Sequence, residues 1–139
     1  MKKAKLTLMM ESSGLGFSSL VPDSEFTVYG SISPSAHEWG ENRITWKDSP
    51  DFTSNSPDTN SFLRLADFKI AKGSANSLIE IDSEELSRFL LTSEENLITF
   101  LLVRETGEFD KQGLVHAFAS KEHPAGPAPT LWFQPAPRP

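Results

Sequence analysis

Short runs of alternating apolar and polar residues recur along this chain, and clusters of glycine, proline, serine and aspartate lie between them. The first run, at 4–10, places an apolar residue at every even position. A period of two is the pattern of a β-strand with one buried face. Further strands are predicted at 26–32, 42–46, 61–71, 77–81, 97–104, 114–120 and 130–133. Many short strands separated by turn residues predict an all-β sandwich or barrel.

One segment departs from the strand pattern. In "DSEELSRFLL", at 82–91, Asp82 is the predicted N-cap and is followed three residues later by Glu85, while apolar residues recur at helical spacing. This segment predicts a short helix lying against the end of a sheet. The proline-rich end of the chain predicts an extended tail at 135–139, after a single β-sandwich domain at 1–134.

Length and composition limit the classes of function. The 139 residues amount to one domain, which is long enough to bury its own core. The sequence holds 13 Lys and Arg against 19 Asp and Glu, a formal net charge of −6, so nucleic acid and anionic membrane are poor partners. The absence of cysteine excludes disulfides, thiolate metal sites and cysteine nucleophiles. We also expect no export signal and no membrane insertion in the chain as given.

Motifs that carry catalysis or bind cofactors are missing from the sequence. The three histidines, His37, His116 and His123, do not have metal-ligand spacing. No dinucleotide loop, Walker lysine or G-x-S-x-G element occurs. We therefore expect a protein that is not an enzyme and that carries no cofactor.

One loop, at 51–60, has side-chain oxygens of the kind that Ca²⁺ takes as ligands. They belong to Asp51, Thr53, Asn55, Asp58 and Asn60. The loop lacks the glycine and the final glutamate of an EF-hand, so a solvated turn is favoured over a calcium site.

Aromatic side chains remain as candidates for binding sugars, because an exposed ring can stack on the apolar face of a sugar. The candidates are Tyr29, Trp39, Trp46 and Trp132. In the predicted strand 42–46, Trp46 shares a face with Ile44 and is expected in the core. Trp132 faces away from its neighbours in the strand 130–133. Trp39 lies in a loop, as a plug over the core or as a platform.

Five segments, in order, carry a resemblance to a known family: "KAKLTL", "FTVYG", "WGENRITWKDSP", "IDSEELSRFL" and "HAFASKEHPAGPAPTLWF". Together they resemble the DNRLRE-domain family, which consists of jelly-roll modules of disaggregatase-related and polysaccharide-lyase-associated extracellular proteins. The resemblance extends from about Ala4 to Phe133. This sequence begins where the family already has its first strands, and it carries an insert-like segment at 49–61. We therefore expect missing N-terminal strands, and with them either an exposed sheet edge beside 4–10 or an uncovered apolar strip that includes Met9.

The resemblance implies a jelly-roll β-sandwich that serves as a non-catalytic carbohydrate-binding or adhesion module of a larger protein, extracellular or on the cell surface. Its expected ligand is a polysaccharide, and acidic polysaccharides are among the candidates. We expect Trp39 and Trp132 to act as stacking platforms, and Arg64 and Arg104 to bind a uronic-acid carboxylate.

Four residues of the matching segments are expected to be structural framework: Glu41, Thr45, Trp46 and Glu122. A buried Glu41 would need partners such as Arg43 or backbone N–H groups. The alternative function is a structural spacer or protein-interaction sandwich without sugar binding. An exposed pair of coplanar aromatic rings on one sheet face would favour sugar binding, whereas buried aromatics alone would favour the spacer.

Overall fold

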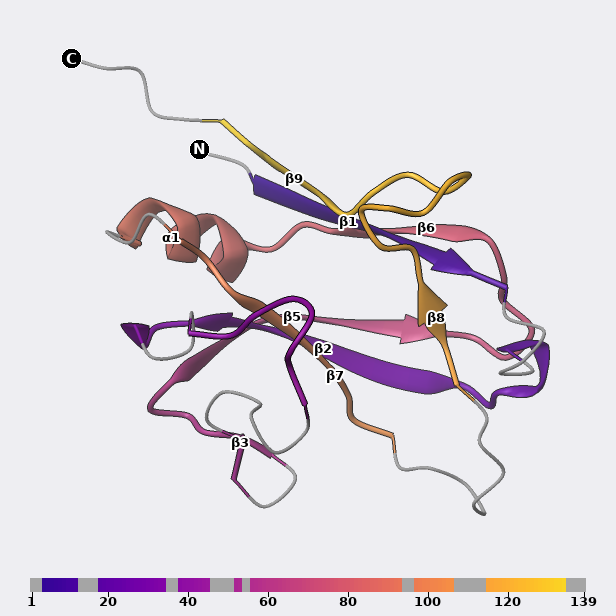
Figure 1. The fold of residues 1–139 in the computed structure, drawn as a ribbon, viewed down its shortest axis with the longest axis horizontal. Coiled ribbons are helices and arrows are strands. Elements are labelled where there is room, and N and C mark those ends of the chain that lie inside the picture. The colour runs from indigo at the N-terminus through magenta and orange to yellow at the C-terminus, as the bar shows by residue number, and fades with distance from the viewer. Residues whose placement is uncertain are drawn as a thin grey trace.

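The computed structural model describes residues 4–12, 18–34, 38–45, 52–53, 56–93, 97–106 and 115–134. Most of its strands form two antiparallel sheets that face each other, and the one α-helix among the described residues lies at one end (Figure 1). The short strands β3 and β4 pair separately with each other. The elements are β1 (Ala4–Glu11), the 3₁₀ turn η1 (Ser18–Leu20), β2 (Ser24–Ser31), β3 (Phe52–Thr53), β4 (Ser56–Pro57), β5 (Phe62–Ile70), β6 (Ser77–Ile81), α1 (Glu84–Thr92), β7 (Phe100–Arg104), β8 (Ala117–Phe118) and β9 (Thr130–Phe133).

The first sheet is built around β1. Strand β6 pairs with one side of β1, and β8 and β9 pair with the other side at its two ends. The prediction of an exposed edge beside 4–10 is therefore wrong, because β1 is the central strand. In this sheet the outermost described strands are β6 on one side and β8 and β9 on the other. The alternating burial along β1 places Ala4, Leu6 and Met10 inside.

The second sheet has the order β5-β2-β7. Along β2, Phe26 and Val28 point into the sandwich and Tyr29 points outward, because successive side chains of a strand alternate between faces. The register with β5 shifts between Val28 and Tyr29, where Leu65 is the additional residue of a bulge. The bulge brings Arg64 opposite Tyr29.

The order of the strands confirms a sandwich of jelly-roll type. Along the chain, β1 lies in the first sheet, β2 and β5 in the second, β6 in the first, β7 in the second, and β8 and β9 in the first. The order β6-β1-β9 facing β5-β2-β7 is the order of six consecutive strands of an eight-stranded jelly roll.

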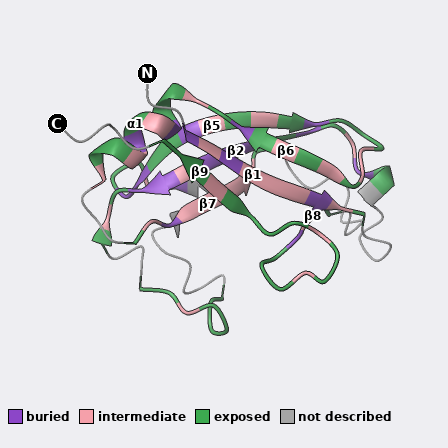
Figure 2. Ribbon diagram, turned by 90° about the horizontal axis from the view of Figure 1, so that it is seen from above, coloured by how far each residue is buried: buried purple, intermediate pink, exposed green. Residues whose placement is uncertain are grey.

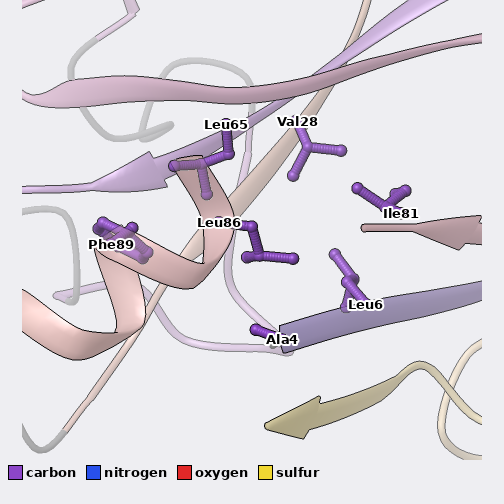
Figure 3. Packing of buried hydrophobic residues seen from close by; sticks show 7 residues of the cluster. All are labelled: Ala4, Leu6, Val28, Leu65, Ile81, Leu86 and Phe89. Atoms are coloured by element: carbon purple, nitrogen blue, oxygen red, sulfur yellow. The ribbon is translucent and has the colours of Figure 1, made fainter. Parts of the chain in front are cut away.

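The core lies between the sheets and extends under α1. One cluster consists of Ala4, Leu6, Val28, Leu65, Ile81, Leu86 and Phe89. Figure 3 shows Leu86 and Phe89 reaching from α1 toward the strands. A second cluster, Met10, Phe26 and Ile70, continues toward β8. Buried residues concentrate in the central strands β1 and β2, and exposed residues in the outer strands and loops (Figure 2).

The helix begins one residue later than predicted. Its N-cap is Ser83 and not Asp82: the Ser83 hydroxyl accepts a hydrogen bond from Leu86 N at 3.0 Å. The same hydroxyl donates to the carbonyl oxygen of Leu65 at 2.6 Å. A hydroxyl can donate and accept at once, whereas a carboxylate can only accept. Serine therefore both caps the helix and attaches it to β5.

The predicted strand at 42–46 is wrong over the residues that the structure describes. Residues 41–43 form a turn, in which the N–H groups of Arg43 and Ile44 donate to the carbonyl oxygen of Gly40. Trp46 lies outside the described residues, as does the predicted tail at 135–139. Two other strands are shorter than predicted, since β7 starts at Phe100 and β8 holds two residues.

Candidate functional site

The structure does not bring the four predicted sugar-binding residues together. Trp132 is 50% exposed on β9, opposite Lys5 on the outer face of the first sheet. Arg64 lies on the outer face of the second sheet, opposite Tyr29. Arg104 is the partner of Phe26 in the register and therefore points toward the inside of the sandwich. These three side chains therefore lie on the outer face of the first sheet, on the outer face of the second sheet and toward the interior, respectively.

Trp39 belongs to a segment, 38–45, that connects the two sheets. Its indole Nε1 donates to Thr99 Oγ1 at 3.2 Å, just before β7. Glu41 pairs with Lys121, which follows β8, at 2.8 Å between Oε2 and Nζ. Because Thr99 adjoins the second sheet and Lys121 the first, the 38–45 segment spans the side of the sandwich between β7 and β8.

Three of the four residues expected to form the framework are described, and all three lie at the surface. Glu41 is exposed, and its partner is Lys121 and not Arg43. Glu122 is also exposed and lies 3.4 Å from the same lysine. Thr45 is exposed. Exposed ion pairs of this kind contribute little to stability, typically below about 1 kcal/mol.

A different group of residues forms an ordered surface on the outer face of the second sheet. Tyr29 lies at its centre, between Arg64 of β5 and Leu101 of β7. The next row along the strands places Thr27 between Asp67 and Val103. We call this surface the Tyr29 face; it consists of Tyr29, Arg64, Asp67, Leu101, Val103 and Glu105, with Thr27 buried among them.

Hydrogen bonds fix the polar groups of the Tyr29 face. Arg64 makes a two-pronged ion pair with Asp67, with Nε to Oδ1 at 3.0 Å and Nη2 to Oδ2 at 2.7 Å. Thr27 Oγ1 donates to the same Oδ1 at 2.8 Å. The Tyr29 hydroxyl donates to Glu105 Oε1 at 3.0 Å. The sheet therefore holds an aromatic ring among polar groups whose orientations are already set.

The protonation states of this face follow from its contacts. Hydrogen bonding from Arg64, with a further contribution from Thr27, lowers the pKa of Asp67, so the carboxylate is ionised at neutral pH. Burial, together with the hydrogen bond to Glu105, raises the pKa of Tyr29, so its hydroxyl stays protonated. Tyr29 is thus a hydrogen-bond donor beside two carboxylates.

Next to this face, a hollow of about 530 Å³ opens between β5 and β6. Arg64 and Asp67 border it on one side, and the carboxylates of Glu80, Asp82 and Glu85 border it on the other. The surroundings of Arg64 are therefore rich in negative charge. Among the described residues, no three histidine, aspartate or glutamate side chains lie close enough together to hold a metal ion.

The candidate calcium loop is described only in part, since Asp51 and Asn55 lie outside the described residues. Asp58 Oδ1 accepts hydrogen bonds from the backbone N and side-chain Nδ2 of Asn60, at 3.0 and 3.1 Å. Its carboxylate stabilises a turn that leads into β5.

Sequence reasoning named Tyr29 among the aromatic candidates but did not place it in the site. The alternation of 26–30 contained the signal, because it puts Tyr29 on the face opposite to the apolar Phe26 and Val28. No local sequence pattern predicts that Tyr29 pairs with Arg64, because this pairing depends on the bulge in β5.

Comparisons of the chain with protein-family models, with curated proteins and with solved structures gave no match. In the described part of the chain, no helix combines the length and the apolar character that crossing a membrane requires.

Proposed function

We propose that this protein is a non-catalytic carbohydrate-binding or cell-surface adhesion module of a larger extracellular protein, as its resemblance to the DNRLRE-domain family implies. The observation that supports this proposal is the Tyr29 face. Its tyrosine ring offers an apolar surface for a sugar ring, and Asp67, Glu105 and Arg64 offer acceptors and donors for hydroxyl groups at fixed positions.

The charges of the Tyr29 face favour a neutral polysaccharide over an acidic one. The Arg64 fork is already occupied by Asp67 and hence is not open to the two oxygens of a uronic acid. Asp67 and Glu105 place negative charge beside it. Together with a net charge of −6, these carboxylates repel an anionic chain.

The proposal can be tested by affinity electrophoresis in gels that contain β-glucan, xylan, mannan or alginate. At least one neutral polysaccharide should retard the folded protein, and Tyr29→Ala should weaken the interaction roughly tenfold, the loss that one aromatic contact implies. Tyr29→Phe keeps the ring and should retain part of the binding. Trp132→Ala, on the opposite sheet, is the matched control and should bind as the wild type does.

Two outcomes would contradict the proposal. If no polysaccharide retards the folded protein, the module does not bind carbohydrate under this test, and the spacer function is favoured. If Trp132→Ala abolishes retardation and Tyr29→Ala does not, the sugar binds to the first sheet.

The alternative function, a protein-interaction or spacer sandwich, has support from a separate observation. Strand β9 exposes two large aromatic side chains in succession, Trp132 at 50% and Phe133 at 55%. Trp132 lies on the outer face of the first sheet opposite Lys5, whereas Phe133 lies opposite Ala4 at the end of the outermost strand β9. An exposed apolar strand of this kind is typical of a contact with another protein.

A further inference from the structure

The turn that connects β8 to β9 is held by a histidine side chain. The Nδ1 atom of His123 accepts hydrogen bonds from the backbone N of Gly126 at 2.7 Å and from that of Ala125 at 3.3 Å. The backbone N of His123 donates to the carbonyl oxygen of Ser120 at 3.2 Å. A ring nitrogen accepts a hydrogen bond only when it carries no proton, so these contacts define a neutral imidazole with its proton on Nε2. We call residues 120–126 the His123 turn.

A carboxylate from β1 approaches the same ring nitrogen. Glu11 Oε1 lies 4.0 Å from His123 Nδ1, and the two side chains are only 22% and 32% exposed. Gly126 completes the cluster, because a Cβ atom added there would lie 2.5 Å from the same carboxylate oxygen and 2.9 Å from Nδ1. The nitrogen therefore has two alternative sets of partners within reach: the N–H donors of the turn and an acceptor on Glu11.

The other charged side chains at the turn pair with one another. Lys121 Nζ lies 2.8 Å from Glu41 Oε2 and 3.4 Å from Glu122 Oε1. All three side chains are more than half exposed, so solvent screens their effect on the imidazole. Among the described residues, Glu11 is the only carboxylate within 4.0 Å of a His123 nitrogen.

We propose that His123 is a pH-sensitive switch of this turn. In the neutral form, Nδ1 accepts from the backbone at 125 and 126 and closes the turn. An imidazole gains a proton as the pH falls between about pH 8 and pH 5, and a protonated Nδ1 is a donor. It can no longer accept from two backbone N–H groups, and it donates to Glu11 instead. Proton binding thus exchanges the hydrogen bonds that close the turn for an ion pair with β1.

The switch acts on the side of the sandwich because the same turn carries Lys121. Through Glu41, this lysine attaches the 38–45 segment to the first sheet. A rearrangement of the His123 turn on acidification therefore also changes the attachment of that segment. The switch is independent of the proposed carbohydrate function, because none of its residues belongs to the Tyr29 face.

The test is an NMR titration of the intact protein from pH 8 to pH 5. At pH 8 the imidazole of His123 should carry a proton on Nε2 and none on Nδ1. The backbone ¹H–¹⁵N signals of Ala125 and Gly126 should shift as the pH falls, with the same midpoint as the ring signals of His123. His116→Phe removes the other described histidine, which makes none of these contacts, and should leave this transition unchanged.

Two substitutions separate the roles of the two partners. His123→Asn keeps an acceptor near the position of Nδ1 but cannot titrate, so the Gly126 signal should stay constant down to pH 5. Glu11→Gln removes the charge that attracts the protonated ring, so the Gly126 transition should move to lower pH. Glu84→Gln, which removes an exposed carboxylate of α1, is the matched control and should titrate as the wild type does.

The proposal is overturned if the Gly126 signal does not follow the titration of His123, or if the ring carries its proton on Nδ1 at pH 8. It is also overturned if His123→Asn shows the wild-type transition, or if Glu11→Gln leaves the midpoint unchanged. The wild-type measurements need no substitution, so a fold defect in one variant, visible in its spectrum, leaves the other measurements to decide.

Discussion

Gly30 of β2 packs directly against the ring of Phe89 of α1. A Cβ atom added at Gly30 would lie 2.6 Å from Phe89 Cζ and 2.9 Å from Leu65 Cδ1. The helix can therefore approach the second sheet only because this position has no side chain. This contact sets the distance between α1 and the second sheet at the end of the sandwich.

Replacing Gly30 by alanine should destabilise the protein by about 1–3 kcal/mol, the cost of overpacking a core. Thermal denaturation should show a Tm lower by several degrees. Adding Phe89→Leu to Gly30→Ala should cost less than the sum of the two single changes, because the smaller side chain relieves the clash. Additive losses would mean that the two residues do not compete for the same space.

Ser83→Ala should cost about 1–2 kcal/mol, since it removes both the N-cap of α1 and the hydrogen bond to Leu65 O. Ser83→Asp should not restore the loss in full, because a carboxylate cannot donate to that carbonyl. Urea unfolding of these variants measures the difference. The neighbouring Asp82→Ala is the control, and a loss equal to that of Ser83→Ala would contradict the assignment of the cap.

The Arg64–Asp67 pair should contribute a small pH-dependent term to stability. The pKa of Asp67 is lowered in the folded protein, so its stabilising contribution is present above the unfolded pKa of 3.8 and is lost as the pH falls through the lower, folded value. The difference in unfolding free energy between wild type and Asp67→Asn should therefore shrink on acidification below about pH 4. Since both side chains are exposed, it should stay under about 1 kcal/mol. A difference that is independent of pH would contradict this account.

Protonation of His116 should also lower the stability of the folded protein on acidification, but in a higher pH range. Its pKa is lowered in the folded state, so protons bind preferentially to the unfolded chain as the pH falls below about 6.5. Wild-type stability should consequently fall between about pH 7.5 and pH 5 relative to His116→Phe, which has no group to protonate. Denaturant unfolding at several pH values measures this change. Parallel pH profiles for the two proteins would show that His116 is not desolvated.

Local patterns were sufficient for much of the fold. The alternation in 4–10 and in 130–133 predicted β1 and β9, and the helical spacing after Asp82 predicted α1. These signals are readable because a strand or helix repeats every two or 3.6 residues along the chain itself. The same alternation failed in 42–45, where the carbonyl oxygen of Gly40 accepts two backbone hydrogen bonds and closes a turn.

The arrangement of the candidate surfaces was decided only by the tertiary structure. The sequence singled out Arg64 and Arg104 for their chemistry, but pairing with β2 places one on the outer face and the other toward the interior. A one-residue bulge at Leu65 aligns Arg64 with Tyr29, and a shift of one residue reverses the face of every side chain in a strand. Which residues of distant strands face one another depends on this register, and the local pattern of a single sequence carries no record of it.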